Sequence, residues 1–278
     1  MAPRWLLTLL AFLLLAVCAT AGAAPKVTQT PDGLVVTTQH FTATFSRPSG
    51  GLLASLTTRD GHSLLGGSTV YTDNGPYGAG VYLGTMKATA QLTTETRGEQ
   101  VIVRAEGTLA SREGVLPTKP GTIRYQVEYT FGDGPQIGLA WSAVPSFNAP
   151  DTAGFMAHLL SVVDIAGVAA NTAEGVLLQD PQDHSTRSYQ AYSMPLDEKR
   201  PWVGVLRTDG RWLLFTDPQS TPPFVNVFLH EQGNGTAAMF FAWLDGTQTR
   251  SLEAGKPWKA SCTVRLLHSL EELGDAGD

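Results

Sequence analysis

The chain has 278 residues, of which 42% are hydrophobic and only 16% are charged, and its formal net charge is −6. Disordered chains usually combine low hydrophobicity with high charge, so most of this chain is expected to fold. The excess of 25 acidic over 19 basic residues argues against a protein that follows nucleic-acid phosphates. Two cysteines do not provide a disulfide framework.

The first 23 residues have the pattern of an export signal. Arg4 precedes an uncharged, leucine-rich run over 6–17, and the small residues Ala-Gly-Ala follow at 21–23. This order of charged, apolar and small residues is typical of a signal peptide, and the apolar run is short for a membrane helix of about 20 residues. Val17 before Cys18 departs from the lipoprotein signal. We therefore expect a secreted or periplasmic protein, without lipidation and with no stable membrane span after cleavage.

Strand patterns separated by tight turns fill the rest of the chain. In 122–131, large apolar residues alternate with polar ones, which is the period of a half-buried antiparallel strand. Asp-Gly and Asn-Gly pairs recur between such segments and favour hairpin turns. The extended segments that we expect, in chain order, are 34–38, 40–46, 52–58, 80–84, 86–97, 100–109, 122–131, 137–144, 156–170, 175–179, 202–207, 211–216, 224–231, 236–244 and 259–267.

This number of strands predicts two packed sheets, because one open sheet rarely holds so many. No linker or change of composition interrupts 24–270, so we expect one all-β domain, a large two-sheet antiparallel super-sandwich with few or no helices after the signal peptide. Residues 269–273 favour a short turn, and 271–278 are expected to form a flexible acidic tail. Cys262 lies on the apolar face of its strand and is expected in the core.

Two segments carry a distinctive order of strands and turns. Residues 41–65 contain a strand, a Gly-Gly turn, a strand, an Asp-Gly turn and an apolar pair, and 250–265 place Gly-Lys-Pro-Trp before a last strand. This order resembles galactose mutarotase-like super-sandwich domains. The resemblance implies a concave sheet face that meets carbohydrate, as in sugar epimerases, glycoside hydrolases and polysaccharide lyases. The epimerases carry a histidine in an Asn-His-x-Tyr-Phe type motif, and this chain has no Asn-His pair, so no epimerase residue is assigned.

The segment 224–231 is the first candidate binding surface. Phe224, Asn226, Phe228 and His230 alternate with three aliphatic residues. Aromatic rings beside an amide and an imidazole can stack on sugar rings and hydrogen-bond to their hydroxyl groups. The alternative is a second packed layer that contains a hydrogen-bonded histidine.

The polar segment 180–192 is the second candidate. Asp183, His184 and Arg187 can serve there as acid, base and anion clamp, and the alternative is a solvated loop. If the protein is an enzyme, we expect His184 and His230 to be catalytic. The residues expected to bind substrate in either case are Asp183, Arg187, Tyr189, Tyr192, Trp202, Phe224, Asn226 and Phe228.

The sequence gives weaker support to a pair of catalytic carboxylates and to metal or cofactor binding. Glycoside hydrolysis needs two carboxylates at a set distance, and the candidates Glu128, Asp183, Asp217 and Glu231 cannot be paired from sequence. No zinc, EF-hand, dinucleotide, P-loop or Gly-x-Ser-x-Gly motif occurs. We therefore expect no cofactor and no metal, with a Ca²⁺ ion in the loop 180–183 as the alternative.

Three functions remain open. The first is a secreted carbohydrate-binding protein that holds an oligo- or polysaccharide on a concave sheet face. The second is a carbohydrate-active enzyme, namely an aldose epimerase, a glycoside hydrolase or a polysaccharide lyase, with His184 or His230 as acid or base. The third is a structural envelope protein that shares only the architecture.

Overall fold

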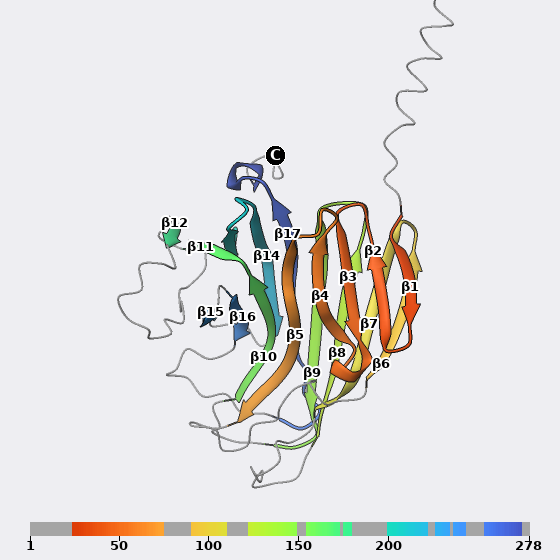
Figure 1. Ribbon diagram of the computed structural model, residues 1–278. Helices are drawn as coiled ribbons and strands as arrows, with labels where there is room; N and C mark the ends of the chain where they lie inside the picture. The colour runs from red at the N-terminus through yellow and green to blue at the C-terminus, as the bar shows by residue number, and fades with distance from the viewer. Residues whose placement is uncertain are drawn as a thin grey trace, which may run out of the picture.

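Two antiparallel β-sheets packed face to face make up the described part of the protein (Figure 1). The computed structural model describes residues 24–74, 90–109, 122–148, 154–172, 175–179, 199–221, 226–233, 236–242 and 253–273. Within these ranges, eight strands form one sheet and nine form the other, and all hydrogen-bonded neighbours run antiparallel. The predicted all-β class and two-sheet sandwich are confirmed.

The strands follow each other across the sheets in an order that combines hairpins with long connections. The eight-stranded sheet runs, from edge to edge, β1 (Lys26–Thr30), β2 (Gly33–Thr37), β3 (Phe41–Ser46), β4 (Leu52–Thr58), β5 (Ser63–Asn74), β10 (Gly154–Val163), β16 (Thr236–Ala242) and β15 (Asn226–Gly233). The nine-stranded sheet runs β12 (Gly175–Gln179), β11 (Ile165–Thr172), β13 (Trp202–Arg207), β14 (Trp212–Thr221), β17 (Trp258–Leu267), β9 (Gln136–Pro145), β8 (Ile123–Phe131), β7 (Gln100–Leu109) and β6 (Gln91–Arg97). Two short 3₁₀ turns, Arg47–Ser49 and Leu270–Leu273, complete the described elements.

Two strands lack a clear signal in the sequence. β1 is an edge strand of mainly exposed residues, and β5 contains a Gly-Gly pair that suggests a turn. β5 is nevertheless extended, because β4 and β10 pair with it on either side. The predicted strand 80–84 lies outside the described residues.

Asp164 separates β10 from β11, in the segment 156–170 for which the sequence favours extended structure over a helix. The extended structure is confirmed, but the two strands belong to different sheets, so the chain turns between them. Asp164 makes the turn in the left-handed conformation, with φ of 57°. Arg207 Nη1 donates to the Val163 carbonyl at 2.9 Å, and the Thr208 amide donates to the Asp164 carbonyl at 2.8 Å. Both carbonyl groups at the turn are therefore satisfied.

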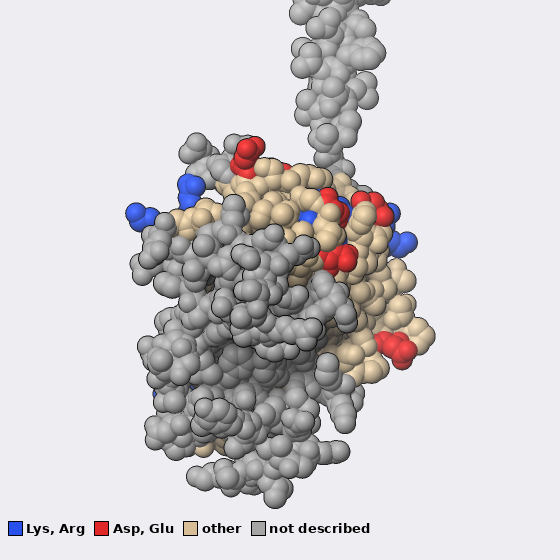
Figure 2. All heavy atoms as spheres, turned by 60° about the vertical axis from the view of Figure 1, so that its left-hand side comes forward, with Lys and Arg blue, Asp and Glu red and all other residues tan. Residues whose placement is uncertain are grey.

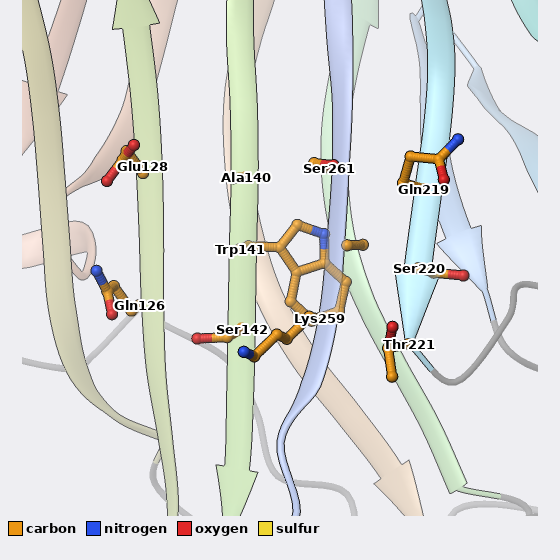
Figure 3. Close-up of a pocket in the computed structure, with 11 residues that line it drawn as sticks. Gln126, Glu128, Ala140, Trp141, Ser142, Gln219, Ser220, Thr221, Lys259 and Ser261 are labelled. Carbon is orange, nitrogen blue, oxygen red and sulfur yellow. The ribbon is translucent and has the colours of Figure 1, made fainter.

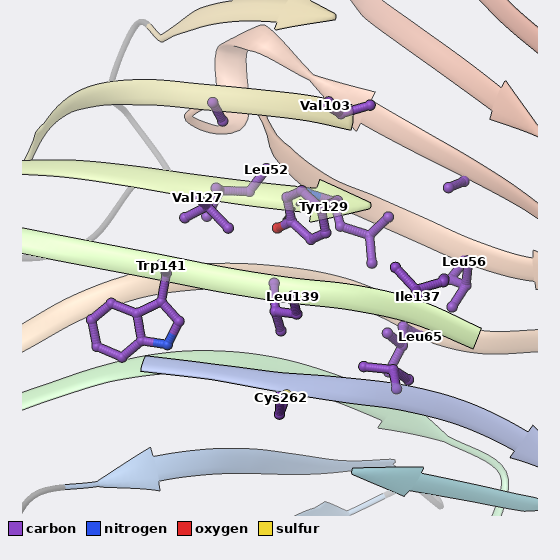
Figure 4. Packing of buried hydrophobic residues seen from close by; sticks show 14 of the residues in the cluster. Leu52, Leu56, Leu65, Val103, Val127, Tyr129, Ile137, Leu139, Trp141 and Cys262 are labelled. Carbon is purple, nitrogen blue, oxygen red and sulfur yellow. Dashed lines mark hydrogen bonds between the residues drawn. The ribbon is translucent and has the colours of Figure 1, made fainter. Parts of the chain in front are cut away.

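The core lies between the sheets (Figure 4), and its described residues come from the inward sides of strands in both sheets, among them β3, β4, β8, β9 and β17. The Phe45 ring of β3 contacts the rings of Tyr129 and Phe131 in β8, with centroids 5.0 and 6.1 Å apart. Tyr129 also accepts a hydrogen bond from the Leu53 amide at 3.3 Å. Cys262 lies in this core as predicted, 7% exposed, and burial raises its pKa to about 12. The thiol therefore stays protonated and acts as a small apolar group.

The outward surface has charges of both signs. On the face shown in Figure 2, the described residues carry acidic and basic side chains in small separate groups. No helix among the described residues is long and apolar enough to cross a membrane.

Candidate functional site

An open pocket of about 420 Å³ lies on the outward face of the nine-stranded sheet, over β8, β9, β17 and β14 (Figure 3). We call it the sheet pocket. Its lining comes from these four neighbouring strands and consists mostly of polar side chains: Gln126, Glu128, Ala140, Trp141, Ser142, Gln219, Ser220, Thr221, Lys259, Ala260 and Ser261.

The strand register arranges the outward side chains of the pocket in two rows across the sheet. One row runs through Thr221, Lys259, Ser142 and Gln126, and the other through Gln219, Ser261, Ala140 and Glu128. Neighbouring strands are about 4.8 Å apart, so each row is about 15 Å long, and the rows are about 7 Å apart. Antiparallel pairing thus gathers polar groups from four distant parts of the sequence on one rigid surface.

A β-bulge in β14 directs two of these side chains into the pocket. Thr216 and Gln219 are three residues apart on β14, whereas their Cα partners on β17 are only two residues apart. Asp217, inside this stretch, has φ of 53°, in the left-handed region. Side chains alternate between the two faces of a regular strand, so one extra residue reverses the alternation beyond it. Gln219 and Thr221 consequently lie on the pocket side of the sheet.

Small side chains keep the centre of the pocket open. Ala140 is the Cα partner of both Ser261 and Glu128, and its methyl group leaves space that a longer side chain would occupy. Beneath it, Trp141 is 4% exposed and belongs to the core between the sheets. The described lining is therefore a polar surface over an apolar floor.

A ladder of charged side chains holds Glu128 at one edge of the pocket. Arg104 donates from Nε to Glu128 at 2.7 Å and from Nη1 to Glu95 at 2.6 Å, and Arg97 Nε donates to the other Glu95 oxygen at 2.5 Å. Hydrogen bonds from Arg97 and Arg104 lower the pKa of Glu95 from 4.5 to about 2. Arg104 is fixed between two carboxylates, so it orients the Glu128 carboxylate.

Lys259 lies on β17, between β9 and the far edge of the pocket at β14. Its side chain is exposed and makes no ion pair with any residue that the structure describes. Figure 3 shows its amino group directed toward Ser142. Lys259 is two strands and two residues away from Glu128, which corresponds to about 12 Å between the Cα atoms.

Most of the predicted site residues are not in the described lining of this pocket. Asp183, His184, Arg187, Tyr189 and Tyr192 lie outside the described residues, as does Phe224.

Asn226, Phe228 and His230 lie on β15, the edge strand of the other sheet. The predicted strand is present, and the orientation of these three side chains stays a prediction. Of the four carboxylates proposed from sequence, Glu128 lines the pocket, Asp217 lies in the bulge beside it, and Glu231 lies on β15.

Trp202 packs in a small apolar cluster with Ala169, Leu214 and Leu267. It is 8% exposed and is not among the described residues of the pocket lining. Packing in this apolar cluster explains the position of Trp202, and little of its indole ring is accessible to a ligand.

The sequence contains part of the signal for the pocket residues. Period-two alternation in 122–131 already places Gln126 and Glu128 on a polar face, and Lys259 and Ser261 alternate with apolar residues in the same way. No local sequence pattern indicates that the polar face with Gln126 and Glu128 and the polar face with Lys259 and Ser261 belong to the same sheet. Among the described residues, no three His, Cys, Asp or Glu side chains lie close enough together to hold a metal ion.

No protein-family model matches the chain, and no curated protein matches it in sequence. Solved structures match at low identity. Galactose 1-epimerase from Lactobacillus acidophilus NCFM has a TM-score of 0.57 and 9% identity, over 87% of this chain and 97% of that one. The GalM/aldose epimerase homologue from C. elegans has a TM-score of 0.54 and 13% identity, over 83% and 96%.

A third match is to part of a larger enzyme. The GH36 alpha-galactosidase AgaB from Geobacillus stearothermophilus has a TM-score of 0.50 and 9% identity, over 88% of this chain and 41% of that one. Identities this low report on fold alone. The two packed antiparallel sheets and these matches together establish that the chain has a galactose mutarotase-like fold.

Proposed function

We propose that this protein is an exported carbohydrate-binding protein that holds a glycan in the sheet pocket. The observation that carries the proposal is the pair of polar rows on four paired strands. Serine and threonine hydroxyls and glutamine amides both donate and accept hydrogen bonds, as sugar hydroxyl groups do. Their placement on a sheet, in place of a loop, gives a ligand a preorganised surface.

The shape of the pocket favours an extended ligand. It is open and polar and extends about 15 Å across the sheet, whereas sites for small molecules are usually deep and mostly apolar. An oligo- or polysaccharide lying across the strands fits this surface better than an enclosed single sugar.

Two further observations support the proposal. The solved structures of the same fold include proteins whose names are galactose 1-epimerase and alpha-galactosidase, so this fold occurs in proteins that are named for action on sugars. The pattern of the first 23 residues supports export, which would bring the protein into contact with extracellular glycans.

A substitution that fills the pocket tests the proposal. Ala140→Phe places a ring between Ser261 and Glu128, and we expect it to lower the affinity for a bound glycan more than tenfold. Binding is measured by calorimetry after a panel of neutral and acidic polysaccharides has identified a ligand. Thr44→Phe is the matched control, because Thr44 is half-buried on the outward side of β3 in the other sheet.

The control should bind like the wild type, and both variants should unfold at the wild-type denaturant concentration. Equal affinity of Ala140→Phe and wild type would place the glycan elsewhere. The absence of any glycan binding would leave a structural envelope role.

A carbohydrate-active enzyme is the second candidate, favoured by the match to galactose 1-epimerase along most of both chains. The described pocket lining holds one carboxylate, Glu128, and hydrolysis commonly uses two. His184 and His230 are therefore the acid and base candidates. If the protein turns over a sugar, His184→Ala or His230→Ala should remove turnover without unfolding the protein, and unchanged rates in both variants would exclude this assignment.

A further inference from the structure

We infer that the sheet pocket selects glycans that carry an anionic group, and that Lys259 binds this group. The inference rests on the proposed function, because it concerns the ligand of the same pocket. It follows from the way in which the described structure distributes charge around the two polar rows.

The two charged residues of the lining differ in their surroundings. The Glu128 carboxylate already receives a hydrogen bond from Arg104 at 2.7 Å. Lys259 has no corresponding carboxylate among the described residues. Among the described residues, the negative charge of the pocket is thus compensated by Arg104, and the positive charge of Lys259 has no carboxylate partner.

Covering Lys259 with a ligand favours an anion. A ligand that lies across the first row removes water from the ammonium group, and this desolvation costs free energy unless a partner replaces the water. A neutral sugar offers only hydroxyl oxygens, whereas a carboxylate or sulfate oxygen gives a charge-assisted hydrogen bond, which is the stronger kind.

The neighbours of Lys259 can complete the anion site. Thr221 and Ser142 are its Cα partners on either side, and both line the pocket. Their hydroxyl groups can donate to the remaining oxygens of an anionic group. Gln219, Ser261 and Glu128 of the second row remain available for the neutral hydroxyl groups of the sugar.

The chemistry of lysine defines the ligand class. An ammonium group acts as a point charge and lacks the fork of an arginine, so it suits one singly charged group, either the carboxylate of a uronic acid or a sulfate ester. The formal charge of −6 on the whole chain repels a long acidic polymer at a distance. The selection is therefore best measured with short oligosaccharides.

Matched pairs of trisaccharides test the inference. The probes are trigalacturonate and its methyl ester, trimannuronate and its methyl ester, and a sulfated galactose trisaccharide with its desulfated form. We expect the full-length protein to bind at least one acidic member about tenfold more tightly than its neutral counterpart. The uronates and the sulfate ester distinguish the two sources of the negative charge.

Substitution at Lys259 assigns the effect to the residue. In Lys259→Met the preference for the acidic member of a pair should fall to within about twofold, and Lys259→Arg should retain most of this preference. Lys256→Met is the control, because Lys256 is exposed, pairs with Glu253 at 2.5 Å and is not in the described pocket lining. Lys256→Met should keep the wild-type preference.

Three results would overturn the inference. They are equal binding of the two members in every pair, a preference that persists in Lys259→Met, and a lack of binding to all six probes. If neutral polysaccharides still bind and Ala140→Phe still lowers their affinity more than tenfold, the proposed function stands and only the selection for acidic sugars fails.

Discussion

Gly107 in β7 leaves the space in which the Tyr125 side chain reaches across the core. A Cβ atom at position 107 would lie 2.5 Å from the Tyr125 hydroxyl oxygen. The ring cannot move aside freely, because this hydroxyl donates to the Gly50 carbonyl at 2.9 Å. Burial raises the pKa of Tyr125, so the hydroxyl stays protonated and remains a donor. A single hydrogen atom at position 107 thus permits a contact between the two sheets.

Gly107→Ala should therefore destabilise the protein by about 1–3 kcal/mol, the usual cost of overpacking a core. Urea unfolding followed by tryptophan fluorescence measures the change. Gly132→Ala is the matched control, since a Cβ there meets nothing within 4 Å. If both variants unfold at the same urea concentration, the close approach of residue 107 to Tyr125 does not contribute to the stability of the protein.

At the scale of the element, the bulge in β14 decides which residues line the sheet pocket. The sequence pattern ends this strand at residue 216, because Asp217-Pro218 resembles a turn. The strand instead continues to Thr221 and pairs with β17 on both sides of the bulge. The left-handed φ of Asp217 absorbs the extra residue.

This geometry makes opposite predictions for two substitutions. Asp217→Val should destabilise the protein by about 1–3 kcal/mol, because a β-branched residue is strained at positive φ, and it should weaken glycan binding by displacing Gln219. Asp217→Gly fits this φ without strain and should keep both properties. Thermal unfolding and calorimetric titration of the two variants measure the difference, and equal stability of the variants would contradict the left-handed conformation.

At the scale of the whole molecule, a cluster of charged side chains joins one end of the two sheets. Arg207 of β13 is 1% exposed and lies 3.3 Å from Asp209, and Arg211 donates to the same carboxylate at 2.8 Å. Arg211 also lies 3.5 Å from Asp60 in the β4–β5 turn of the other sheet. Burial alone would raise the pKa of Asp209, but hydrogen bonds from Arg211 and Arg207 outweigh it and hold this pKa well below its ordinary value of 3.8.

Arg207→Met should lower the unfolding free energy by about 3 kcal/mol at neutral pH. The reason is that the Asp209 carboxylate and the Val163 carbonyl lose the buried Arg207 guanidinium as a partner. The cluster stabilises the ionised form of Asp209, so its contribution is complete above pH 3.8 and is lost as the pH falls further. The deficit of the variant should therefore shrink below pH 3.8. Guanidinium unfolding at several pH values measures it, with Arg124→Met on the exposed side of β8 as control. If the difference in unfolding free energy between Arg207→Met and the wild type does not change with pH, ionisation of Asp209 does not contribute to it.

The sequence by itself determines the class of the fold and much of the core. Alternation in 122–131 predicts which side of β8 is buried, and the same reasoning places Cys262 inside. These predictions succeed because a period of two is a property of the local chain, which the hydrophobic effect acts on directly. The two-sheet architecture follows from the number of such segments.

Only the tertiary structure decides the composition of the sheet pocket. Gln126, Ser142 and Lys259 meet because β8, β9 and β17 pair in one register, and Thr221 joins them through a bulge that looks like a turn in the sequence. The extended state of β5 and the change of sheet at Asp164 likewise depend on partners far along the chain. Hydrogen bonds between strands fix these relations, and they link residues whose distance in space bears no relation to their distance in sequence.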